Sequence, residues 1–140
     1  MGARTKARKR ALDLCYEADL RGLPLDGTLD QHVERRRVGG EPVLNDYTLA
    51  LVRGIVANQS RIDALLTELS VAWPLDRMPA VDRNLLRLGA YEVLLVDDVP
   101  DAVAISEAVQ LARELSTEES PQFVNGVLAR VAERRPSVTA

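Results

Sequence analysis

Three features of the sequence predict an all-α fold with about seven helices. Leucine and alanine are abundant, whereas aromatic residues make up only 4% of the 140 residues. Apolar residues recur at intervals of three and four positions, and stretches that alternate with a period of two are almost absent. A chain of this length buries a core without disulfides or metals. We therefore expect one all-helical domain over residues 1–140.

The N-terminal part of the chain predicts two helices. The first runs from Thr5 to Asp19, has an apolar stripe along one side, and ends before Gly22, which suits a C-terminal cap. Residues 23–27 then form a loop. A short polar helix over residues 29–37 follows, and it closes in residues 38–42, where glycine and proline interrupt helices.

Two further helices and a bend come next. Apolar residues between positions 44 and 69 keep helical spacing, with a break predicted over residues 54–60. Asn58 or Ser60 would cap the second of these helices. Residues 73–79 contain two prolines, so we expect a bend there.

Three helices complete the predicted fold. Residues 81–96 are apolar on nearly every side, so this helix should lie at the buried centre. Pro100 and Asp101 open the next helix, and Ser120 and Pro121 suit the N-cap and first position of the last one. The residues expected to be buried are Ile105, Ala108, Val109 and Ala112 in the first of these two helices, and Val124, Val127, Leu128 and Val131 in the second.

The composition excludes several classes of protein. With one cysteine, Cys15, and one histidine, His32, the chain can form no internal disulfide and lacks ligands for a cysteine and histidine metal site. His32 stands in a polar helix without a catalytic partner, and no glycine-rich phosphate loop is present. We therefore expect neither enzymatic activity nor a cofactor. The lone cysteine and the lack of a signal peptide or apolar span favour the cytoplasm.

The basic N-terminus is the most informative feature. Residues 1–10 carry five cations and no acid, whereas the rest of the chain carries 13 cations against 21 carboxylates. The five are Arg4, Lys6, Arg8, Lys9 and Arg10. Cations at a helix N-terminus oppose the helix dipole, so helix stability does not explain them, but neutralising RNA phosphates would. The alternative is a solvated, frayed terminus, and charge alone leaves both open.

Two further clusters are candidates for binding. Phe123, the only phenylalanine, lies in the first turn of the last helix beside Gln122 and Asn125. An aromatic ring with two amides can stack on and hydrogen-bond unpaired bases, although core packing is the commoner role for such a ring. Charges around the proline bend, including Asp76 and Arg77, suit either a protein-binding surface or solvated helix ends.

Three segments carry a recognisable pattern in order and spacing. They are Ala7–Glu17, Val81–Glu92, and Ala104–Ala108 leading to Phe123–Leu128. The Leu-Arg-Leu-Gly-Ala-Tyr-Glu and Phe-Val-Asn-Gly-Val-Leu stretches are the most specific parts. Together the segments resemble the NusB family of bacterial transcription antitermination factors over nearly the whole chain. The resemblance implies a NusB-like seven-helix fold of two small helical bundles and a role without catalysis.

The resemblance also implies partners and site residues. Members of this family bind boxA of nascent ribosomal RNA together with a small-subunit ribosomal protein, NusE, and help RNA polymerase to read through terminators in ribosomal RNA operons. The residues expected to bind RNA are Arg4, Lys6, Arg8, Lys9, Arg10, Gln122 and Phe123. Those expected at the partner surface are Tyr16 and Asp82, which match positions of the family, together with Asp76 and Arg77 from the charged proline bend.

The sequence leaves two alternatives to an RNA-binding factor. One is a helical adaptor that binds only proteins, and the salt dependence of RNA binding would separate it from the first. The other is the similar helical module of ribosomal RNA cytosine methyltransferases, for whose catalytic domain a chain ending at Ala140 leaves no room. If RNA is bound, we expect the basic N-terminus and Phe123 to meet as one composite site.

Overall fold

A computed structural model describes residues 2–139, and side chains over residues 2–135. This part of the chain contains six α-helices, one short 3₁₀ helix and no strand, which confirms the all-α prediction. The helices are α1 (Ala3–Arg21), α2 (Leu25–Gly39), α3 (Asp46–Leu69), η1 (Leu75–Arg77), α4 (Ala80–Leu95), α5 (Asp101–Leu115) and α6 (Ser120–Thr139). The chain divides into two compact units, residues 1–57 and residues 58–140, and the boundary falls within α3.

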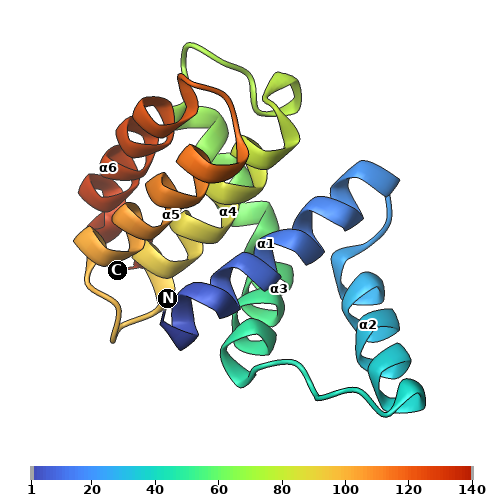
Figure 1. The fold of residues 1–140 in the computed structure, drawn as a ribbon. Helices are drawn as coiled ribbons and strands as arrows, with labels where there is room; N and C mark the ends of the chain where they lie inside the picture. Colours follow the sequence, from blue (N-terminus) through green and yellow to red (C-terminus); the bar gives the residue numbers. More distant parts are fainter. Residues whose placement is uncertain (1, 140) are drawn as a thin grey trace. The chain divides into compact units, whose positions relative to one another are not determined.

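In the first unit, α1 and α2 form a helical hairpin (Figure 1). Gly22 ends α1 in the left-handed conformation, with φ of 63°, so the predicted glycine cap is confirmed. The N–H of Leu23 completes this cap by donating to the Ala18 carbonyl at 2.9 Å. Helix α2 begins at Leu25, four residues before the predicted start, because Pro24 provides a suitable first φ and its carbonyl accepts the N–H of Thr28.

Helix α3 runs without interruption through residues 54–60, so the predicted break is wrong. A glycine inside a helix costs only about 1 kcal/mol relative to alanine, and burial on both sides of Gly54 outweighs that cost. The buried residues that keep one helical phase are Leu51, Ile55, Ile62, Leu66 and Leu69. Neither Asn58 nor Ser60 caps a helix, because both lie inside α3, where the side-chain oxygen of Asn58 accepts a hydrogen bond from Arg61. Since one helix replaces two, the described chain has six α-helices rather than seven.

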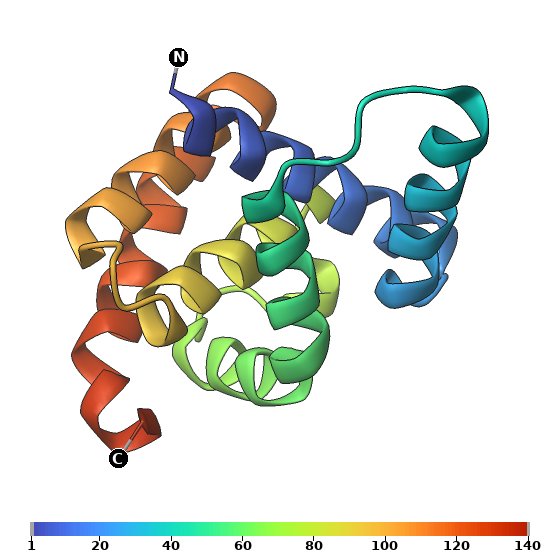
Figure 2. The same ribbon diagram turned by 90° about the horizontal axis from the view of Figure 1, so that it is seen from below.

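In the second unit, α4, α5 and α6 pack against one another in all three pairings (Figure 1 and Figure 2). Helix α4 is buried along most of its length, as predicted, and the four predicted apolar residues of α6 are all buried. The predicted stripe of α5 is shifted: Ala108 and Ala112 are buried, but Ile105 and Val109 are half-exposed while Ala104 and Leu111 lie inside. Within residues 2–139, no helix is long and apolar enough to cross a membrane.

Gly89 allows the close approach of α4 and α6. A Cβ atom added at this position would lie 2.6 Å from Cδ1 of Leu128 and 3.5 Å from Cβ of Ala108. Leu128 is fully buried, so its methyl groups could make room for a Cβ only by shifting into close-packed neighbours. The spacing of this helix pair therefore depends on the missing side chain at position 89.

Gly89→Ala is expected to destabilise the protein by about 1–2 kcal/mol, because overpacking against Leu128 outweighs the gain in helix propensity. Gly126→Ala is the matched control, since a Cβ at that helical position meets nothing closer than Arg130 Nη1 at 3.8 Å. The control should be as stable as the wild type or more stable by up to about 1 kcal/mol. Denaturant unfolding measures both, and equal stabilities of the two variants would contradict the packing argument.

Candidate nucleic-acid interface

The cations of residues 1–10 lie on the first turns of helix α1 rather than on an extended tail. Helix α1 begins at Ala3, its first turn holds no acidic residue, and the N–H of Lys6 donates to the Gly2 carbonyl at 3.1 Å. Arg4, Lys6 and Arg10 are exposed and Lys9 is half-exposed. Arg8 differs, because it is only 3% exposed. Four of the five predicted cations therefore lie at the surface, and Arg8 points inward.

Tyr47, which sequence reasoning missed, contacts two of these arginines. The Cζ atom of Arg4 lies 4.2 Å from the centroid of the Tyr47 ring, and that of Arg8 lies 5.6 Å from it. Both distances fall within the range of cation–π attraction. Arg4 and Arg8 are four residues apart and therefore lie on one side of α1. The i, i+4 spacing of the two arginines can be recognised in the sequence, but nothing local in the sequence predicts that a tyrosine of α3 contacts them.

The start of α3 holds Tyr47 in place. The N–H of Tyr47 donates to the Asn45 side-chain oxygen at 2.7 Å, and the N–H of Leu49 donates to the Asn45 carbonyl, so Asn45 caps the helix. Next to the ring, the buried hydroxyl of Thr48 donates to the Ala7 carbonyl of α1 at 3.0 Å. These bonds attach the first turn of α3 to the first turns of α1.

At the start of α6, Phe123 and its neighbouring amides have different surroundings. The half-buried ring of Phe123 packs edge-to-face on Trp73, with ring centroids 5.3 Å apart and an interplanar angle of 62°. Gln122 and Asn125 instead line an open cavity of about 580 Å³ between the end of α5 and the start of α6, together with Arg113. The ring thus contacts the proline bend, whereas the amides face the cavity.

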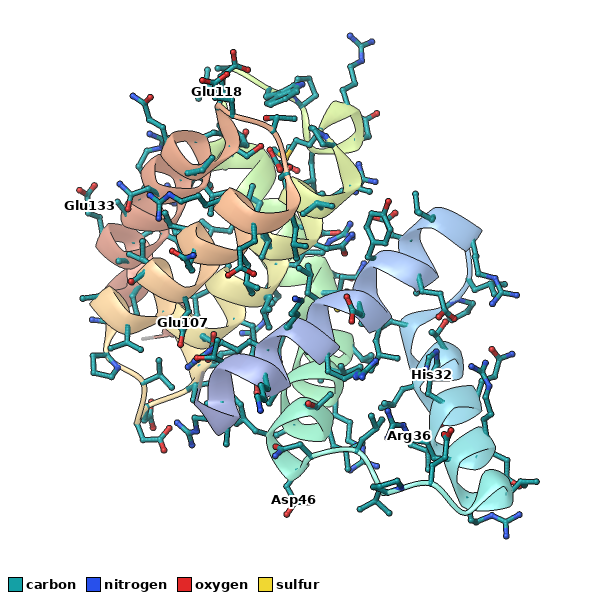
Figure 3. The ribbon with its side chains drawn as sticks, in the orientation of Figure 1. His32, Arg36, Asp46, Glu107, Glu118 and Glu133 are labelled. Atoms are coloured by element: carbon teal, nitrogen blue, oxygen red, sulfur yellow. The ribbon has the colours of Figure 1, made fainter. Side chains whose placement is uncertain are left out.

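Asp82 lies inside the fold and ties α4 to the α5–α6 turn. It is completely buried, and its carboxylate accepts hydrogen bonds from the hydroxyls of Ser120, at 2.8 Å, and Ser116. The N–H of Phe123 donates to the Glu119 carbonyl, so Ser120 is the first helical residue and not the predicted N-cap. The Ser120 hydroxyl donates a hydrogen bond to Asp82 instead of capping the helix. Any effect of Asp82 on a partner surface would therefore pass through the α5–α6 turn, where Figure 3 places Glu118.

The other residues expected at a partner surface are accessible. Asp76 and Arg77 are exposed on η1, and Tyr16 of α1 is 36% exposed. Arg83 fixes the bend that carries η1, because its guanidinium donates to the Leu75 and Met78 carbonyls at 3.1 and 3.2 Å. The predicted proline bend is therefore confirmed as a 3₁₀ turn attached to the start of α4.

His32 has a partner that the sequence did not reveal. Its Nε2 atom lies 3.0 Å from Oε1 of Glu17, which joins α2 to α1 inside the hairpin (Figure 3). The hydrogen bond with His32 is the main reason that the pKa of Glu17 lies below its ordinary value of 4.5, and Arg21 and Arg35 lower it further. Among the described residues no group of three or more His, Cys, Asp or Glu side chains could hold a metal ion, and Cys15 is buried.

Asp82→Ala is expected to lower the free energy of unfolding by about 1–3 kcal/mol, because the buried Ser120 hydroxyl and the half-exposed Ser116 hydroxyl lose their carboxylate acceptor. Asp76→Ala, which removes an exposed carboxylate nearby in the sequence, should change it by less than about 0.5 kcal/mol. Chemical denaturation of both variants measures the difference. Two equally stable variants would mean that the buried carboxylate contributes nothing to stability.

The Glu17–His32 pair predicts an acid-sensitive contribution to stability. Since the folded pKa of Glu17 lies below its ordinary value of 4.5, the contribution is complete above that value and is lost as the pH falls through the folded pKa. Glu17→Gln should therefore unfold at a lower temperature than the wild type at neutral pH and at the same temperature near about pH 3. His32→Ala should reproduce this behaviour. A gap in melting temperature that stays constant with pH would refute the linkage.

Comparison with known proteins identifies relatives over the whole chain. The model of the NusB family matches residues 5–133. A transcription antitermination protein NusB of Nocardioides sp. is 56% identical over 138 residues, covering 99% of each chain. The protein of the same name in Kineococcus radiotolerans is 55% identical over 141 residues and covers both chains completely.

Solved structures share the fold. The structure of NusB from T. maritima has a TM-score of 0.80 and 32% sequence identity, covering 94% of this chain and 92% of the other. A structure of the antitermination factors NusB and NusE in complex with double-stranded RNA has a TM-score of 0.76 and 27% identity, covering 93% of this chain and 96% of the matched one. The helical arrangement described above is thus similar to that of a protein solved with RNA.

Proposed function

Because the chain belongs to the NusB family, we propose that it is a transcription antitermination factor that binds boxA of nascent ribosomal RNA together with the ribosomal protein NusE. In this role it promotes read-through in ribosomal RNA operons. Relatives more than half identical over the full length carry the name transcription antitermination protein, and one similar structure contains NusB, NusE and RNA. Such a factor acts on RNA polymerase in the cytoplasm and requires no catalytic residue or cofactor.

The observation that supports RNA binding best is the exposed cation cluster on the first turns of α1. Arg4, Lys6 and Arg10 are exposed, and Arg10 lies 3.9 Å from the exposed Asp13 carboxylate, although the chain as a whole has a net charge of −3. A local positive field attracts a phosphate backbone whatever the net charge of the protein. Phe123 and Gln122 would add contacts to bases. Arg8 is buried, so its contribution to RNA binding would be to support its neighbours rather than to contact phosphate.

The proposed partner surface consists of the exposed members of the predicted set, Tyr16, Asp76 and Arg77. Charged and aromatic side chains of this kind are common at protein interfaces, where they contribute orientation as well as affinity. Asp82 would act from inside, because its two serine bonds hold the α5–α6 turn.

Replacing Arg4 and Lys6 by alanine is expected to weaken binding to a short boxA-like single strand and to flatten its salt dependence. For single strands the slope of log K against log salt should lose about 0.7 for each phosphate contact removed. Fluorescence anisotropy titrations over a range of salt concentrations measure the slope. One strand that crosslinks to both α1 and Phe123 would support the composite site expected from the sequence.

The control for this experiment removes two arginines from the other unit, Arg61 and Arg134, of which Arg134 pairs with Glu68 at 2.8 Å. The control changes the net charge by the same amount but leaves the basic segment of α1 intact. It should therefore leave the salt slope within error of the wild type. An equal loss in both double variants would indicate a nonspecific charge effect. Wild-type affinity in the Arg4 and Lys6 variant would remove the N-terminus from the RNA site and favour a protein-binding adaptor.

NusE is expected to raise the affinity for boxA RNA by about ten-fold or more, because a partner that contacts the same strand adds a second binding surface. RNA titrations with and without saturating NusE test this. Asp76→Ala combined with Arg77→Ala should reduce the gain without changing the affinity of the isolated chain for RNA. Equal RNA affinities with and without NusE would contradict joint binding.

A further inference from the structure

We propose that Tyr47 is a positioning residue for RNA binding, whose ring holds the exposed Arg4 guanidinium in place for a phosphate. The inference rests on the proposed function and deepens it. It adds to the RNA site a residue of α3 that carries no charge and that does not belong to the basic segment. The geometry at the Tyr47 ring, rather than its sequence position, supports the assignment.

The contact joins an exposed cation to a buried one. Arg4 is exposed and its Cζ atom lies 4.2 Å from the ring centroid, whereas Arg8 is buried with its Cζ atom 5.6 Å from the same centroid. Tyr47 is half-exposed between these extremes. The ring therefore lies against an exposed arginine and a buried arginine that are four residues apart on the same side of α1.

Holding Arg4 is useful because this residue otherwise occupies an unfavourable place. A cation in the first turn opposes the helix dipole, and this turn has neither an acidic residue nor a side-chain N-cap. A long free side chain also loses rotamer entropy when it binds a phosphate. Contact with an aromatic face offsets both effects, since the negative face of the ring attracts the guanidinium and restricts its rotamers before RNA arrives.

Arginine suits this arrangement better than lysine would. A guanidinium can stack with its flat face on an aromatic ring while the N–H groups at its edge stay directed outward as donors. Those donors match the paired oxygens of a phosphate. Arg4 can thus keep its contact with Tyr47 while it binds RNA. The Tyr47 ring contacts the flat face of the guanidinium and the phosphate contacts its edge, so the two do not compete.

The ring itself is well supported. Asn45 caps the helix that carries it, and the buried bond from Thr48 to the Ala7 carbonyl joins that helix to α1 immediately beside the arginines. The position of Tyr47 relative to Arg4 is therefore set by main-chain and buried side-chain bonds. Such support is the condition under which a second residue can pre-organise a binding group.

A double-mutant cycle between Arg4→Ala and Tyr47→Leu tests the inference, with boxA-like single-stranded RNA as the probe. Tyr47→Leu alone should weaken RNA binding about two- to five-fold, the loss expected for one exposed cation–π contact. In the Arg4→Ala background the same substitution should have no further effect, because the residue that it positions is gone. Tyr47→Phe should restore wild-type affinity, since the ring and not the hydroxyl makes the contact.

Thr28→Val is the matched control, because it removes a hydrogen bond within the same unit, from the Thr28 hydroxyl to the Pro24 carbonyl at 3.1 Å, and leaves the bonds that hold Tyr47 intact. It should lower the melting temperature yet leave RNA affinity equal to that of the wild type. This variant separates loss of stability from loss of positioning. A loss of affinity equal to that of Tyr47→Leu would show that a general loss of stability explains the effect, and would overturn the inference.

The remaining outcomes are distinct. An equal loss from Tyr47→Leu with and without Arg4 would show that the ring acts independently, for example by stacking on a base, and would overturn positioning through Arg4. Wild-type affinity of Tyr47→Leu beside a weakened Arg4→Ala would reject only the role of Tyr47. If the wild-type protein failed to bind boxA RNA at all, with or without NusE, the proposed function itself would fail.

Discussion

Burial of α4 against α5 and α6 is the constraint on which the second unit depends. The absence of a side chain at Gly89 allows α6 to approach closely enough for Leu128 to pack on α4. The same packing brings the α5–α6 turn to the first turn of α4, where Asp82 accepts the hydroxyls of Ser116 and Ser120. A buried carboxylate is costly unless its oxygens are satisfied, so this polar cluster stabilises only the arrangement that apolar packing creates.

Charge in this protein is organised by place rather than by amount. The net charge is −3, yet the first turns of α1 expose three cations and hold no acid. Two carboxylates are already hydrogen-bonded within the fold: Asp82 accepts from serine hydroxyls, and Asp63 accepts from the guanidinium of Arg87 at 2.8 Å. A polyanion approaching α1 therefore meets a positive field that the overall composition conceals. The contact of Arg4 with Tyr47 places one of these positive charges at a defined position on α1.

The predictions from sequence succeeded where the determining contacts are local. Gly22 ends α1, the residues expected to be buried in α6 are buried, and the two prolines near Trp73 make a bend. They failed where burial overrode local preference. Gly54 does not interrupt α3, because the apolar residues on both sides keep the helix continuous. Ser120 was expected to cap α6, but its hydroxyl binds Asp82, a partner 38 residues away in the sequence.

The sequence by itself determined the all-α class, the buried stripes of α4 and α6, the basic start of α1 and the family. Helical periodicity and capping depend on residues within about four positions of one another, so the local sequence is sufficient to predict them. Only the tertiary structure decided that Arg8 is buried while Arg4 is exposed, that both lie at Tyr47, and that His32 binds Glu17. The supporting bond from Thr48 to Ala7 spans 41 residues, and contacts over such separations arise only when helices pack.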